Sequence, residues 1–210
     1  MLDLNYFDWE SVFSNKRWHL PHLCQENVVY FITFRLRDSI PQAKIEFWHD
    51  QYERWLAANP PPHSPEQVEQ AKELTIRKAE RFLDRGFGKC VLRNSRCQDS
   101  VEHVLRNRDG IDYAQGDFVI MPNHVHVLFR PVGRPDLGTL IGPWRSISAK
   151  DINRRLSRQG ALWQPEPFDH IVRSPDTLAK VRRYIRNNPK NLPPASARYG
   201  YGTLFDEYPQ

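Results

Sequence analysis

Runs of apolar residues along the chain predict strands that alternate with helices. Residues 27–37, NVVYFITFRLR, are rich in β-branched and aromatic side chains and predict a central strand. Residues 111–115 and 117–130 predict a hairpin, or one strand that is interrupted at Gly116. Short extended segments are expected at residues 90–92 and 171–172.

Helical periodicity and capping residues predict the helices between these strands. We expect helices over residues 41–56, 65–83, 98–107, 138–158 and 175–187. Ser64 and Ser174 each precede a proline at the first helical position, which is typical of a helix start. Pro189 disfavours helical geometry at Asn188 and so ends the last helix.

This order of elements indicates an α+β fold. We expect an antiparallel sheet with helices packed on one face, which leaves the other face free to carry a site. The 210 residues suit a single domain, 1–210. Within it we expect an irregular N-terminal arm (about 1–26), a helical insertion (about 57–85) and a surface tail rich in Pro, Gly and Tyr (about 193–210).

Composition and charge narrow the function classes. Lys and Arg number 30 against 25 Asp and Glu, and a basic surface often meets phosphate, although a plain solvated surface is also consistent with this balance. The three cysteines are odd in number and lack CxxC spacing, which favours reduced thiols in the cytoplasm over a disulfide or zinc-finger framework. The chain shows no apolar run of the ~20 residues that a membrane span needs and no signal peptide, so we expect no membrane partner.

Two histidines stand two residues apart in the apolar run GDFVIMPNHVHVLFRP. Side chains at positions i and i+2 of a strand share one face, so His124 and His126 project the same way. Paired neutral imidazoles can clamp a divalent metal ion. Histidines in strands also serve as hydrogen-bonded structural residues, and the pair alone does not decide between the two roles.

A tyrosine and an asparagine share one face of the last predicted helix, SPDTLAKVRRYIRNNP. Leu178, Val181 and Ile185 form its apolar stripe, and Tyr184 lies about a quarter turn away by the ~100° step per residue. Asn188 follows one turn after Tyr184. A tyrosine at the margin of the core would give the same pattern.

Taken in order, these stretches resemble a known family. MPNHVHVLF is followed some sixty residues later by YIRNNP, and VYFITFRL, WRSISAKDINRRL and LWQPEPFDHIVRS accompany them. The set resembles the single-tyrosine HUH transposases, and most closely the REP-associated tyrosine transposases, over about residues 19–192. The resemblance implies a ferredoxin-like antiparallel sheet of the HUH endonuclease type.

The resemblance also implies roles for four residues. His124 and His126 match the metal-binding histidines, Tyr184 matches the catalytic tyrosine, and Asn188 sits where related enzymes place a polar third ligand. Ligand softness alone would suggest zinc, with His170 as a further candidate ligand, whereas the resemblance implies Mg or Mn. The implied activity is metal-dependent cleavage and transfer of single-stranded DNA through a 5′-phosphotyrosine intermediate.

The implied partner is single-stranded or hairpin-forming repeat DNA, bound by a monomer or homodimer. Basic side chains would contact phosphates, and residues of the N-terminal arm would read bases beside a hairpin. Two alternatives stay open: a hairpin-binding regulator that no longer cleaves, and a replication-initiator-type nuclease with the same chemistry. The candidate DNA contacts are Arg145, Lys150, Arg154, Arg182, Arg183, His19 and His22.

Overall fold

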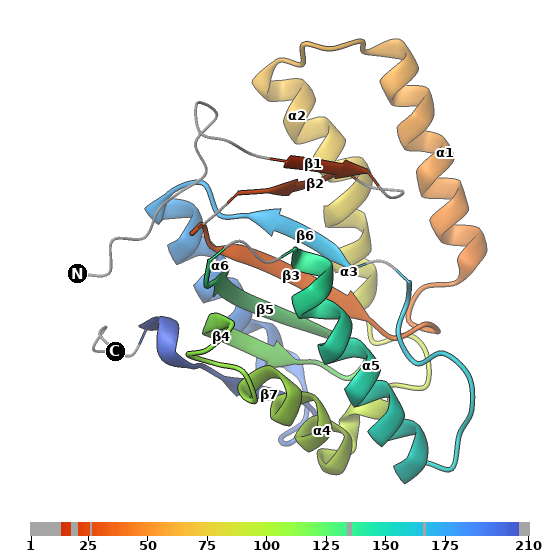
Figure 1. The fold of residues 1–210 in the computed structure, drawn as a ribbon. Helices are drawn as coiled ribbons and strands as arrows, with labels where there is room; N and C mark the ends of the chain where they lie inside the picture. Colours follow the sequence, from red (N-terminus) through yellow and green to blue (C-terminus); the bar gives the residue numbers. More distant parts are fainter. Residues whose placement is uncertain (1–13, 18–20, 26, 134–135, 166, 206–210) are drawn as a thin grey trace.

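The computed structural model describes residues 14–17, 21–25, 27–133, 136–165 and 167–205. Its centre is a five-stranded antiparallel sheet with the strand order β6-β3-β5-β4-β7 (Figure 1). This confirms the expected α+β class and antiparallel sheet. The strands are β3 (Tyr30–Arg35), β4 (Tyr113–Ile120), β5 (His124–Pro131), β6 (Phe168–Ile171) and β7 (Arg198–Gly200).

Helices cover both faces of this sheet. α4 (Ser95–Arg106) and α5 (Leu137–Arg155) pack on one face, over a core that includes Tyr113 and Trp144. α6 (Pro175–Asn187) packs on the opposite face through Leu178 and Ile185. The expectation of helices on one face therefore holds for α4 and α5, whereas α6 departs from it because its apolar stripe meets the second apolar face of the sheet.

A helical excursion separates β3 from α4. It consists of α1 (Gln42–Ala58), α2 (Pro65–Lys72), a π-helical turn η1 (Glu73–Arg77) and α3 (Lys78–Leu83). The backbone N–H of Gln67 donates to Ser64 Oγ at 3.3 Å, and the Ser64 N–H donates to Gln67 Oε1 at 2.8 Å, so a capping box starts α2. In Figure 1 the excursion stands at the β3–β6 side of the sheet.

Three short segments differ from the predictions. Residues 90–92 are not a strand: Cys90 has a positive φ of 50°, which bends the chain into a 3-10 turn, η2 (Val91–Arg93). The β4–β5 pair turns at residues 121–123, and the irregularity near Gly116 is a shift of register between Gln115 and Phe118. In the N-terminal arm, β1 (Ser14–Arg17) and β2 (Pro21–Cys24) form a separate hairpin.

The C-terminal tail is part of the sheet. β7 pairs with β4, and a 3-10 turn, η4 (Thr203–Phe205), follows it. Gly200 allows this close approach, because a Cβ there would lie 2.4 Å from Phe118 Cζ. The expectation of a tail lying over the surface is wrong for these residues. None of the described helices has the length and hydropathy of a membrane span.

A buried carboxylate joins β4, α6 and β7. Asp117 is fully buried and accepts hydrogen bonds from Arg182 Nε at 2.6 Å and from the Tyr199 hydroxyl at 2.6 Å. Arg186 donates to the same hydroxyl at 3.2 Å. The sheet thus holds α6 through charged hydrogen bonds as well as through its apolar stripe.

Replacing Asp117 by alanine should lower the free energy of unfolding by roughly 3–5 kcal/mol, because it leaves Arg182 without its buried partner. Urea unfolding followed by circular dichroism measures the change. Arg183→Ala is the matched control, since this exposed neighbour should change stability by only about 0.5 kcal/mol. Equal stability of Asp117→Ala and the wild type would show that the network does not hold α6.

Candidate active site

The two histidines lie side by side at the start of β5. Both are fully buried, and their ring centroids are 4.6 Å apart. The pairing of β3 with β5 sets His126 opposite Thr33 and His124 opposite Arg35. Their imidazoles share one face of the sheet, as strand alternation predicted, and α6 covers that face.

The hydrogen bonds of Asn123 define the tautomer of His124. Asn123 Nδ2 donates to the backbone carbonyls of Leu83 at 3.2 Å and Phe87 at 3.0 Å. Its Oδ1 is therefore the atom that faces His124 Nδ1 at 2.8 Å, so Nδ1 carries the hydrogen. His124 Nε2 is left with a free lone pair, and it is buried without a hydrogen-bond partner among the described residues.

His126 links a strand residue to the tyrosine helix. Its Nδ1 lies 2.7 Å from Thr33 Oγ1, and its Nε2 lies 3.2 Å from the Tyr184 hydroxyl. Phe31 stacks on the imidazole with ring centroids 5.3 Å apart. When Thr33 accepts the hydrogen of Nδ1, Nε2 is free to accept from the phenol or to bind a cation.

Tyr184 reaches this face because α6 starts at a fixed point. Ser174 Oγ accepts a hydrogen bond from the Thr177 N–H at 3.1 Å, which is the predicted N-cap. Tyr184 and Phe31 meet edge to face, with centroids 6.2 Å apart. Tyr184 therefore stands beside His126 rather than merely at the margin of the core.

The residues present fit a divalent cation. His124 Nε2 and Asn188 Oδ1 are both buried polar atoms without a hydrogen-bond partner among the described residues. Two imidazole nitrogens and one amide oxygen form an incomplete set that oxygen atoms of a substrate or water would complete. No group of three His, Cys, Asp or Glu side chains with metal-binding geometry occurs among the described residues. The side chain of His170, the further candidate ligand, lies outside them.

Burial and nearby carboxylates keep Tyr184 protonated. Burial raises the pKa of the phenol, the charges of Glu80 and Asp84 raise it further, and a hydrogen bond with Asn188 opposes this shift. Burial also raises the pKa of Glu80 to about 7, with a further contribution from Asp84. Both carboxylates belong to the C-terminal part of the helical excursion, so this insertion contributes charge to the site.

The buried histidines are neutral. Burial lowers the pKa of His124 to about 3. Burial, and then the proximity of His124, lowers the pKa of His126 well below its usual value. Neutral imidazole is the form that binds a metal ion, so the site needs no proton release from these rings.

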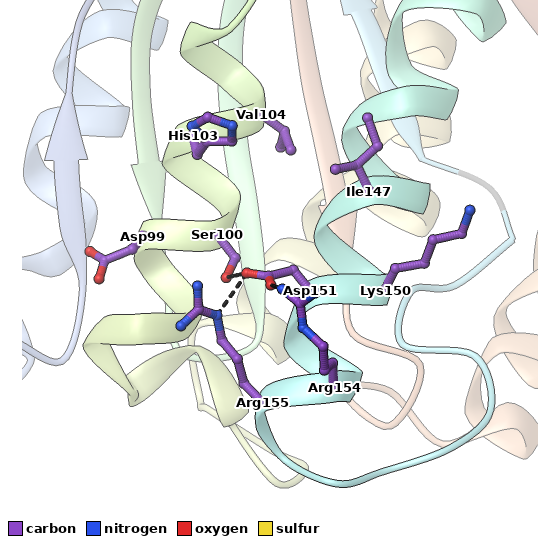
Figure 2. A pocket seen from close by; sticks show the side chains of 9 residues that line it. All are labelled: Asp99, Ser100, His103, Val104, Ile147, Lys150, Asp151, Arg154 and Arg155. Atoms are coloured by element: carbon purple, nitrogen blue, oxygen red, sulfur yellow. Dashed lines mark hydrogen bonds and ion pairs between the residues drawn. The ribbon is translucent and has the colours of Figure 1, made fainter.

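The predicted DNA contacts do not gather in one place. Lys150 and Arg154 line a cavity of about 750 Å³ between α4 and α5, on the sheet face opposite the histidines. In Figure 2 Arg154 turns to Asp151, whereas Lys150 points away from it.

The other predicted contacts lie elsewhere in the structure. Arg145 donates to the Gln164 carbonyl. Arg182 turns inward to Asp117, and Arg183 is exposed. His19 and the side chain of His22 lie outside the described residues.

Sequence reasoning missed Thr33, the hydrogen-bonding role of Asn123, and Glu80. Thr33 stands 93 residues before its partner His126, and only the strand register brings them together. Asn123 directly precedes the histidine pair, and this proximity was the one available signal. Glu80 could not be assigned because nothing in the pattern of the insertion shows which part of the fold it covers.

Comparison with known proteins gives a family match over part of the chain. Residues 92–188 match the model of a family described as IS200-like transposases, a range that contains both histidines, Tyr184 and Asn188. The match confirms the resemblance drawn from the motifs. A search of curated proteins finds no match. Among solved structures, the chain is similar to a REP-associated tyrosine transposase bound to a REP hairpin, with 16% identity, a TM-score of 0.41, and coverage of 83% of this chain and 71% of that one.

Acidification should weaken the folded state through the histidines. Below about pH 6.5 the histidines of the unfolded chain bind protons, whereas the buried rings of the folded protein stay neutral. The free energy of unfolding that the two histidines contribute above this pH is therefore lost as the pH falls toward 3. We expect each ring to lower the free energy of unfolding by up to about 1.4 kcal/mol per pH unit. Urea unfolding between pH 4 and 8 without divalent metal measures this slope.

The control for this prediction removes Glu80, whose effect on stability changes with pH in the opposite direction. Glu80 has a raised pKa, so its contribution is present at low pH and lost as the pH rises through about 7. The comparison is therefore made in a Glu80→Gln background, where His124→Gln should flatten the slope. An unchanged slope would mean that His124 is not held neutral.

Proposed function

We propose that this chain, whose residues 92–188 match the family of IS200-like transposases, is a metal-dependent single-stranded DNA endonuclease and strand transferase with Tyr184 as its nucleophile. One observation carries the proposal. The Tyr184 hydroxyl lies 3.2 Å from His126 Nε2, next to a second histidine whose buried Nε2 has no hydrogen-bond partner among the described residues.

Three residues would hold the cation. His124, His126 and Asn188 are the donors, and Mg or Mn suits their open, oxygen-completed set. A divalent ion bound there would polarise the scissile phosphate and stabilise the charge that develops on its oxygens. The hydrogen bond from His124 Nδ1 to Asn123 fixes the ring for this role.

Tyr184 would attack the phosphorus in line. A bond forms between the phenol oxygen and phosphorus, the bond from phosphorus to the 3′ oxygen breaks, and the 5′ end is held as a phosphotyrosine. The phenol needs a proton acceptor, because its pKa is raised. The phenol proton would pass to water, and the departing 3′ oxygen would take a proton from water.

The arrangement favours a cleaving enzyme over a hairpin-binding regulator. A regulator would not require Tyr184 to stand beside His126 or a buried imidazole to keep a free lone pair. A replication-initiator-type nuclease uses the same chemistry and is the second candidate. A transfer assay separates the two, since a transposase rejoins the cut strand to a second 3′ hydroxyl.

The proposed partner is hairpin-forming single-stranded DNA. Exposed Arg183 on α6 and Lys150 on α5 support contacts to phosphate, and Arg182 would act indirectly by holding α6 to Asp117. The free thiols of Cys90 and Cys97 support the proposal that the protein is located in the cytoplasm. We propose a monomer or homodimer.

Tyr184→Phe should abolish a covalent DNA adduct while binding stays nearly unchanged, because only the nucleophilic oxygen is removed. Labelled hairpin DNA with single-stranded flanks is incubated with the protein and Mg²⁺ or Mn²⁺, and the products are separated on a denaturing gel. Tyr201→Phe is the control, since that side chain is exposed. An adduct with the Tyr184 variant would refute the assignment.

His124→Ala and His126→Ala should each lower metal affinity and cleavage by at least about tenfold. Calorimetric titration of Mn²⁺ measures binding without any dependence on activity. Asn188→Ala should weaken binding less than either histidine variant, because an amide oxygen is the weakest of the three donors. His103→Ala is the control, since this exposed histidine lies on α4 at the other face. Equal affinity for Mn²⁺ in all variants would show that these residues do not bind the metal.

A further inference from the structure

Arg35 is a buried cation that the proposed cleavage leaves without a role. Its side chain is largely shielded, with 5% relative exposure, and its Nε and Nη1 atoms have no hydrogen-bond partner among the described residues. Its guanidinium carbon lies 5.6 Å from the centroid of the Phe168 ring, a cation–π contact. A buried cation with two nitrogen atoms that lack hydrogen-bond partners among the described residues is costly to the fold, so its presence calls for a ligand with acceptor atoms.

The strand register sets Arg35 on the same face as the histidines. Arg35 pairs with His124 across β3 and β5, and residues directly opposite in an antiparallel pair project to the same side. Thr33, two residues earlier on β3, already contacts His126. Arg35 therefore neighbours the proposed metal site directly.

Arg35 lines a cavity of about 470 Å³ with a mixed wall. Trp48 and Tyr52 of α1 and Phe168 of β6 supply aromatic faces, and Gln42 and Glu46 supply polar groups. Gln42 Nε2 donates to Glu46 Oε1 at 3.1 Å, so this carboxylate is partly satisfied within the protein. The size and the mixture suit an organic ligand that carries both a flat apolar part and an anion.

The helical excursion builds this cavity beside the tyrosine. Ala79 of α3 lines it, and the next residue, Glu80, acts on the pKa of Tyr184. At α1, the Lys44 ammonium lies 5.6 Å from the Trp48 ring and 5.2 Å from the Phe82 ring. The helical excursion thus lines the cavity, acts on the pKa of Tyr184 and adds the exposed cation of Lys44 close to the cavity wall.

We propose that this cavity, the Arg35 pocket, binds one unpaired nucleotide of the substrate strand next to the scissile phosphate. Arg35 would take a phosphate in its planar fork, and the base would stack on the aromatic wall. The inference rests on the proposed function, because that function makes the ligand single-stranded DNA. Free phosphate would use Arg35 alone and leave the aromatic wall without a role. Burial lowers the pKa of Arg35 to about 10, so the guanidinium stays charged at neutral pH.

The test measures binding without cleavage. Fluorescence anisotropy at fixed salt compares two labelled 12-mers of equal charge, oligo-dT and an abasic phosphodiester strand, in a Tyr184→Phe background without divalent metal. The parent protein should prefer oligo-dT by about 5- to 150-fold, the range for stacking of a base on an aromatic side chain. Trp48→Ala should remove most of this preference, whereas Arg35→Met should weaken binding of both strands by about tenfold or more.

A stability measurement separates ligand binding from a structural role. Arg35→Met should unfold at the same or a higher urea concentration than the parent, because it removes a buried cation whose Nε and Nη1 lack hydrogen-bond partners among the described residues. A structural role predicts clear destabilisation instead. Arg35→Lys keeps the charge without the planar fork and should bind at an intermediate level, and it serves as the second variant if the methionine variant does not fold. Arg96→Met, at an exposed site on α4 across the sheet, controls for loss of one positive charge.

Two failures are distinguishable. If the parent binds both strands equally, or if the Arg35 and Trp48 variants bind like Arg96→Met, the pocket is no nucleotide site, even when hairpin DNA still forms an adduct with Tyr184. If the parent binds neither strand and the wild type forms no adduct, the proposed function fails and this inference fails with it.

Discussion

The register between β3 and β5 is the constraint on which the site depends. It sets Thr33 opposite His126 and Arg35 opposite His124, all on the face that α6 covers. A slip by one residue would turn these side chains into the opposite core and bring apolar residues to the site. The two faces of β3 differ strongly in chemistry, with Tyr30, Ile32, Phe34 and Leu36 in the core beneath α4 and α5, so the slip is strongly disfavoured.

Charge in this protein is arranged around a neutral centre. The buried histidines carry no charge at neutral pH, the buried guanidinium of Arg35 lies opposite His124, and the carboxylates of Glu80 and Asp84 act on the neighbouring Tyr184. Burial, and then the charges of these carboxylates, raises the pKa of Tyr184 and keeps its phenol protonated. A cation held by the histidines would oppose this influence, so the proposed metal binding would be coupled to activation of the phenol through electrostatics.

The helical excursion is integrated with the site. The Leu83 and Phe87 carbonyls orient Asn123, which in turn orients His124. A change in the position of α3 would therefore alter the imidazole, the carboxylates near Tyr184 and the Arg35 pocket together. Elsewhere on α6, Asp117 holds the helix to the sheet through Arg182. The tyrosine is thus positioned from two directions by segments that are distant in sequence.

The sequence by itself determined the features that repeat at short range. Strand alternation placed His124 and His126 on one face, helical spacing placed Tyr184 one turn before Asn188, and Ser174 marked the start of their helix. The tertiary structure decided which residues meet across long separations: Thr33 with His126, Asn123 with the end of α3, Asp117 with Arg182, and β7 with β4. Periodicity reports which face of an element is apolar, whereas the partner of that face follows from register and packing, which no local pattern contains.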